Sequence, residues 1–175
     1  MEKILEITNL TKKYFSKNAL KNVNLSLDKG RILGLMGPNG SGKTSLLKII
    51  AGLQHSNSGE VLVCGKKIGT ETKKLVSFLP DKNVLYPYMK AIDAINFFQN
   101  YYDDFDVNKA FELLDFMKLD KDEKVSSMSK GMIEKLNLSL TFSRNAKLFV
   151  LDEPLGGVDP VAREKIISTI IKTYN

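Results

Sequence analysis

Residues 37–44 of this 175-residue chain read GPNGSGKT. This stretch matches the phosphate-binding loop G-x-x-x-x-G-K-[ST] at every fixed position. The apolar run at 31–36 (RILGLM) predicts a buried strand before the loop, and the spacing of apolar residues over 45–53 predicts a helix after it. A glycine-rich turn with a solvent-facing lysine is the alternative. The full match between a predicted strand and helix favours nucleotide binding.

These residue types have a definite chemistry. Glycines let backbone N–H groups surround a phosphate, and the N-terminus of the following helix adds about half a positive charge. Lys43 can reach the β- and γ-phosphates, and the Thr44 hydroxyl can bind Mg²⁺. We expect the following residues to bind a nucleotide: Gly37, Asn39, Gly40, Ser41, Gly42, Lys43, Thr44 and Ser45.

The composition is that of a globular domain, with 43% apolar residues. No apolar run approaches the length of a membrane span, and the first residues do not resemble a secretion signal, so we expect a cytoplasmic protein. Cys64 is the only cysteine, which excludes disulfides within the chain. The net charge of +6 comes from lysines in scattered pairs, a pattern typical of solvated faces, so we expect no nucleic-acid partner.

Alternation of apolar and polar residues, or short apolar runs, predicts strands over 3–10, 23–27, 60–65, 75–79 and 147–151. Apolar residues three and four apart predict helices over 91–102, 107–117, 130–143 and 161–174. Asp106 and Ser129 are the candidate N-caps of the second and third of these helices. The pattern predicts an α/β fold: an antiparallel β part and phosphate-loop core over 1–81, a helical insertion over 82–145, and a closing segment over 146–175.

The predicted strand at 147–151 leads directly into Asp152 and Glu153. In phosphoryl transfer, a carboxylate at a strand end can hold Mg²⁺, and a second carboxylate can orient or deprotonate water. Alone such a pair is a weak signal. Beside a phosphate loop it predicts that Asp152 binds the metal and that Glu153 and Lys43 are catalytic.

Four further stretches resemble the ATP-binding cassette (ABC) domain. Tyr14 matches the aromatic residue that stacks on adenine in that family, with a core tyrosine as the alternative. MSKGM at 128–132 is similar to the signature LSGGQ, and LDEPLGGVDP at 151–160 is similar to LDEPTSGLDP. SFLPDKNVLYP at 77–87 falls where the family has its Q-loop. The resemblance extends from about Ile4 to the last residue.

The resemblance implies a P-loop NTPase fold of the ABC type with a mixed sheet core. It also implies an ATPase that requires Mg²⁺ and forms an ATP-dependent homo- or heterodimer. In such a dimer Ser129 and Gly131 complete the ATP site of the opposite subunit. The implied partner is an integral membrane permease, which would hold the protein at the inner face of the membrane. The motif variants look most like those of bacterial exporters. We expect the permease to dock on residues 83–98, because this segment follows Asp81 and is rich in aromatic residues such as Tyr86 and Tyr88.

The chain departs from the family pattern at several positions. Asp81 stands where the family has a glutamine; a carboxylate can still bind Mg²⁺ but should alter the coupling to the permease. Lys130 and Met132 replace Gly and Gln in the signature, and Gly156 replaces a serine. The family's switch histidine has no counterpart before Asn175, so we expect a truncated domain with little or no turnover.

Three other functions remain open at this point. A soluble ABC ATPase acting on ribosomes or DNA would share all these motifs. A module that binds ATP without hydrolysing it would suit a truncated domain. A small-molecule kinase would explain the phosphate loop but not the SKG and LDEP motifs.

Overall fold

The computed structural model describes residues 2–154, 156, 163, 164 and 166. These residues form two compact units. The first consists of residues 2–78 and 146–152, and the second consists of 79–145 with the described residues from 153 onward.

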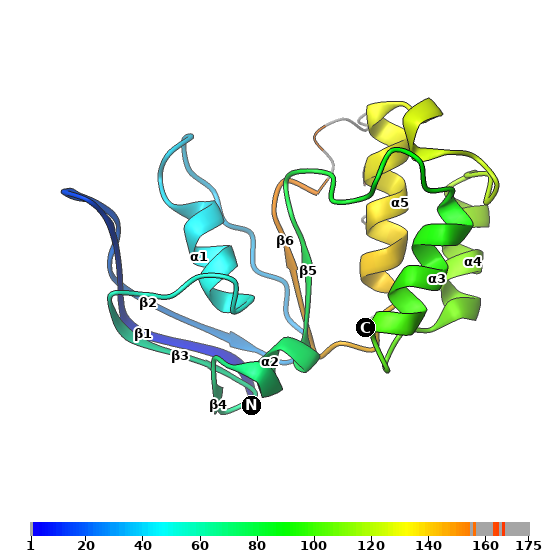
Figure 1. Cartoon of the computed structure of the whole chain (residues 1–175). Coiled ribbons are helices and arrows are strands. Elements are labelled where there is room, and N and C mark those ends of the chain that lie inside the picture. The colour runs from blue at the N-terminus through cyan, green and yellow to red at the C-terminus, as the bar shows by residue number, and fades with distance from the viewer. Residues whose placement is uncertain (1, 155, 157–162, 165, 167–175) are drawn as a thin grey trace. The chain divides into compact units, whose positions relative to one another are not determined.

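A four-stranded antiparallel sheet forms one part of the first unit, with strands in the order β2-β1-β3-β4 (Figure 1). The strands are β1 (Lys3–Tyr14), β2 (Lys17–Asp28), β3 (Ser58–Val63) and β4 (Lys66–Lys67). The predicted strands at 3–10 and 23–27 lie within β1 and β2, which extend further because they form a hairpin. Phe15 allows the tight turn between them by adopting a φ of 51°.

The rest of the first unit consists of helices α1 (Lys43–Ile50) and α2 (Thr70–Leu75) and a two-stranded sheet of β5 (Val76–Leu79) and β6 (Leu148–Leu151). In Figure 1, β5 and β6 run in the same direction, so the unit has both antiparallel and parallel pairing. Apolar residues of β1, α1, β3 and β6 share one buried core, which includes Leu5, Ile7, Leu46, Ile49, Val61, Leu148 and Val150. The core therefore fixes α1 against both sheets.

The strand predicted at 31–36 is absent from the structure. Residues 31–38 have no regular structure, and Ile32, Leu33 and Met36 are 73%, 42% and 96% exposed. A strand needs hydrogen-bonded neighbours, and no described strand pairs with this segment. The apolar composition of residues 31–36 predicted that they are buried, but it could not show whether another strand pairs with them. Helix α2, which follows Gly69, was also missed because its sequence resembles a polar turn.

The second unit contains three packed helices (Figure 1): α3 (Ala91–Tyr101), α4 (Val107–Phe116) and α5 (Lys130–Phe142), with the 3₁₀ turn η1 (Val125–Ser127) before α5. Both predicted N-caps are confirmed. Asp106 accepts a hydrogen bond from the Lys109 N–H at 3.0 Å, and Ser129 accepts one from the Met132 N–H at 3.3 Å.

A partly buried ion pair joins the α3–α4 connection to the end of α5. Arg144 donates to both carboxylate oxygens of Asp104, at 2.9 and 3.1 Å. Its guanidinium also lies 4.0 Å from the centre of the Tyr102 ring. Such bidentate, stacked arginines fix the relative position of the segments they join.

The helix predicted at 161–174 lies mostly outside the described residues. Within this range the structure describes Arg163, Glu164 and Ile166, and all three are helical. Among the described residues, no helix has both the length and the apolar character needed to cross a membrane.

Candidate functional site

The phosphate loop leads into α1, and Gly42 is the N-cap of that helix, with a φ of 98°. A Cβ on Gly42 would lie 2.3 Å from the backbone oxygen of Ala19 in β2, so only glycine fits there. At Gly40, by contrast, a Cβ would meet nothing within 4 Å. The loop is therefore pressed against the sheet on one side and open on the other.

Lys43 lies at the start of α1. Its Nζ donates hydrogen bonds to the backbone oxygens of Gly37 at 2.7 Å and Pro38 at 3.0 Å. Within α1 there is no acidic residue in the first turn and no side-chain cap. The partial positive charge of the helix N-terminus is therefore not neutralised by the helix itself, which is the arrangement that binds anions.

Tyr14, at the end of β1, contacts α1 and the segment after it. Its hydroxyl forms a hydrogen bond with the Ser45 Oγ at 3.1 Å and accepts one from the Gln54 side-chain amide. The hydrogen bond with Ser45 is the largest of the causes that lower the pKa of Tyr14, while partial burial opposes it. The alternative of a core tyrosine is wrong, because the ring lies at the surface.

Asp152 follows β6 and is only 3% exposed. Its Oδ2 is buried and has no hydrogen-bond partner among the described residues. A buried, unpartnered carboxylate oxygen is costly unless a cation binds it, so this atom fits a Mg²⁺ site. The described residues hold no cluster of three or more acidic, His or Cys side chains of the kind that binds a metal. A metal here would take its other ligands from Thr44, nucleotide phosphates and water.

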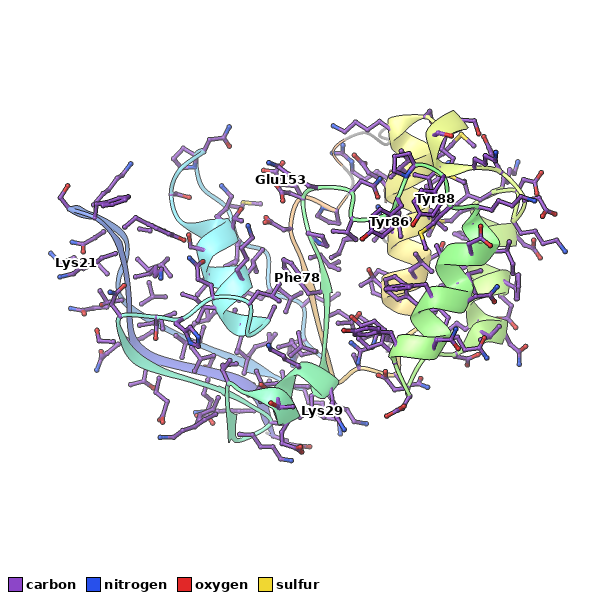
Figure 2. The ribbon with its side chains drawn as sticks, in the orientation of Figure 1. Lys21, Lys29, Phe78, Tyr86, Tyr88 and Glu153 are labelled. Carbon is purple, nitrogen blue, oxygen red and sulfur yellow. The ribbon has the colours of Figure 1, made fainter. Side chains whose placement is uncertain are left out.

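Glu153, labelled in Figure 2, is exposed. Its φ of 49° lies in the left-handed region that non-glycine residues seldom adopt. Such backbone strain is often found at functional sites. Glu153 belongs to the second unit, whereas Asp152 closes the first.

The other predicted site residues also lie in the second unit. Ser129 caps α5, and Gly131 lies in the first turn of that helix and is half-buried. Asp81 is exposed on the segment between β5 and α3. The first unit thus contains the phosphate loop, Tyr14 and Asp152, and Tyr14 contacts Ser45 just after the loop, while the second unit holds the predicted signature and Q-loop residues.

Sequence reasoning missed two residues near Tyr14. Gln54 donates to its hydroxyl, and the Lys12 Nζ lies 5.2 Å from the centre of its ring. The alternation within β1 places Lys12 and Tyr14 on one face of the strand, which is a signal that could have been used. Gln54 gave no such signal, because it follows α1 in a polar loop.

A family model described as ABC transporter matches residues 20–156, well over half of the chain. The chain belongs to the ABC transporter family. Its fold is that of the family's cassettes: a putative ABC transporter ATP-binding protein from Pyrococcus furiosus superposes with a TM-score of 0.85. The two are 29% identical, and the match covers 96% of this chain and 84% of that one. The predicted fold class is thereby confirmed.

Relatives from Bacillus species are also named as ATP-binding proteins, and the first two below come from Bacillus subtilis (strain 168). The uncharacterized ABC transporter ATP-binding protein YdbJ is 36% identical over 164 residues, which are 91% of this chain and 53% of YdbJ. The linearmycin resistance ATP-binding protein LnrL is 32% identical over 175 residues, which are 95% of this chain and 56% of LnrL. The aliphatic sulfonates import ATP-binding protein SsuB of Bacillus cereus (strain ZK / E33L) is 31% identical over 95% of this chain and 68% of SsuB. The chain thus spans just over half the length of YdbJ and LnrL.

Proposed function

We propose that this protein binds and hydrolyses ATP as the cassette subunit of a transporter and powers a separate membrane-spanning subunit. The observation that carries the proposal is the arrangement of the phosphate loop. Gly42 packs the loop against β2, the N-terminus of α1 has no acidic residue in its first turn, and the Lys43 Nζ bonds across the loop to the backbone oxygen of Gly37. Family membership supports ATP as the ligand.

Binding requires a small rearrangement of Lys43. The ammonium group leaves the backbone oxygens of Gly37 and Pro38 and pairs with the β- and γ-phosphates, which are stronger partners because they are charged. Backbone N–H groups of the loop and the first turn of α1 bind the remaining phosphate oxygens. Tyr14 stacks on the adenine ring.

Thr44 and the buried Oδ2 of Asp152 would hold Mg²⁺, with Asp81 as a further candidate ligand. When bound, the ion neutralises charge that develops on the transferred phosphoryl group. Glu153 orients the attacking water and accepts its proton.

A second cassette, either the same chain or a homologue, completes each ATP site. Ser129 caps α5 and leaves the N-terminus of that helix available to a phosphate, and Gly131 lets a phosphate approach the backbone. ATP bound between two cassettes stabilises their dimer by mass action, and hydrolysis of the ATP removes this stabilisation.

For the membrane subunit we propose docking on the segment 83–98. Tyr86 and Tyr88 lie on it between β5 and α3 (Figure 2), stacked with ring centres 5.5 Å apart and largely exposed. Exposed aromatic residues of this kind are typical of protein interfaces. The protein would then lie at the cytoplasmic face of the membrane. Of the two directions of transport we propose export, because LnrL is named for resistance to linearmycin and export of a compound is one way to resist it; SsuB, by contrast, is named for import.

The test of hydrolysis is Glu153→Gln in the full-length protein. The substitution keeps the size of the side chain but removes the base, so we expect ATP binding to persist, hydrolysis to fall at least about a hundredfold, and a dimer to accumulate with ATP. Glu71→Gln is the control, because Glu71 is an exposed carboxylate paired only loosely with Lys66 at 3.6 Å. Equal ATPase rates for Glu153→Gln and wild type would remove Glu153 from the mechanism.

A further inference from the structure

The Tyr14 side chain is held at both its hydroxyl and its ring. The hydroxyl contacts Ser45 in the first turn of α1 and Gln54 beyond the end of that helix. These two residues fix the outer end of the ring relative to the helix that begins at the phosphate loop. A tyrosine with two hydrogen-bond partners cannot swing freely about its side-chain bonds.

One face of the ring is already covered. The Lys12 Nζ lies 5.2 Å from the ring centre and donates a hydrogen bond to the backbone oxygen of His55 at 2.7 Å. The cation is therefore itself held in place, over the π-face of an aromatic ring. A flat ligand can then stack only on the other face of Tyr14.

The hydrogen bond from Gln54 comes with an unfavourable feature. The Gln54 Oε1 is buried and has no partner among the described residues. Burial of an unpaired amide oxygen opposes folding, so stability alone does not explain this orientation of the side chain.

We infer that Gln54 and Ser45 are positioning residues that hold Tyr14 as a one-sided platform for the adenine base, at a fixed distance from the phosphate loop. This inference rests on the proposed function, in which Tyr14 binds the base. It explains why the residue is tyrosine rather than phenylalanine: the hydroxyl links the base platform to the helix that carries the phosphate site. It also makes base recognition depend on Gln54, which does not touch the nucleotide.

The test compares two ligands on the full-length protein by calorimetry: ATP, which has a base, and inorganic tripolyphosphate, which has none. Tyr14→Phe keeps the ring but loses its anchor, and Gln54→Leu removes one anchor while keeping a similar size. Both should weaken ATP binding about two- to tenfold, the effect of one net hydrogen bond. Tyr14→Ala removes the platform and should weaken it about fivefold or more. Binding of tripolyphosphate should not change in any of the three.

Tyr101→Phe and Gln99→Leu are the matched controls, because both residues are exposed on α3 in the other unit. They should leave both affinities unchanged. Unchanged ATP affinity in Tyr14→Phe and Gln54→Leu, with a loss in Tyr14→Ala, would overturn the anchoring and leave the proposed function intact. A parallel loss of tripolyphosphate affinity would also overturn it, since a general distortion would then be the cause. Failure of the wild-type protein to bind ATP would overturn the proposed function as well.

Discussion

The backbone oxygen of Ala19 lies only 2.3 Å from the position that a Cβ of Gly42 would occupy. Strand β2 thus presses directly on the residue at which the phosphate loop becomes α1. Gly42→Ala must displace either the strand or the loop, and it must also force alanine into a φ of 98°. We expect ATP affinity to fall at least about tenfold and the free energy of unfolding to fall by roughly 2–3 kcal/mol.

Gly30→Ala separates the effect of backbone strain from the effect of the clash with Ala19. Gly30 also has a positive φ, 73°, but a Cβ there would meet nothing within 4 Å. It should therefore cost only about 1 kcal/mol of stability, from backbone strain, and leave ATP binding unchanged. Equal ATP affinities for Gly42→Ala and Gly30→Ala would show that the contact with Ala19 does not shape the loop.

Asp152→Asn tests the proposed metal site. The substitution keeps the shape of the side chain but removes the negative charge of the carboxylate whose Oδ2 is buried. We expect ATP binding without Mg²⁺ to be unchanged and the gain in affinity on adding Mg²⁺ to shrink about tenfold or more. Titration of Mg²⁺ at fixed ATP measures this gain, and Asp28→Asn, at the end of β2, is the control. An undiminished Mg²⁺ effect in Asp152→Asn would place the metal elsewhere.

Asp104→Ala tests the ion pair that joins the α3–α4 connection to the end of α5. It would leave the guanidinium of Arg144, a residue only 4% exposed, without the carboxylate it binds at 2.9 Å. We expect a loss of roughly 2–4 kcal/mol in unfolding free energy, less than for a fully buried pair because the Asp104 side chain is 28% exposed. Chemical denaturation measures it, with Asp103→Ala as the exposed neighbouring control. A loss no larger than that of the control would contradict the assigned role.

Local chemistry accounts for what could be predicted from the sequence. The phosphate loop is recognisable because its glycines, lysine and threonine act within eight consecutive positions. Asp106 and Ser129 were identified as N-caps because a cap bonds to a backbone N–H three residues away. The helices α3, α4 and α5 end within one residue of the predicted limits, because their apolar spacing is regular.

What could not be predicted depends on contacts between distant parts of the chain. The apolar run at 31–36 suggested a strand, yet a strand exists only where another strand pairs with it. The hydrogen bond between Gln54 and Tyr14 joins residues 40 positions apart, and no pattern near either residue indicates it. Likewise, the clash between Ala19 and a Cβ at position 42 is visible only once β2 is folded against the loop.

Co-purification tests whether this cassette powers a membrane-spanning subunit. The full-length protein is tagged at its native level, cells are solubilised in mild detergent, and the bound proteins are identified and quantified. Two variants are compared with the wild type: Tyr88→Lys and Tyr101→Lys. Both tyrosines are 72% exposed, so the two substitutions introduce the same charge at equally exposed positions, one inside the proposed docking segment and one outside it.

The account predicts one integral membrane protein at a constant ratio to the cassette. That ratio should fall about tenfold or more with Tyr88→Lys, since a charge would replace an aromatic contact at the interface, and should hold with Tyr101→Lys. Recovery of ribosomes or DNA-bound proteins in place of a membrane subunit would contradict the claim.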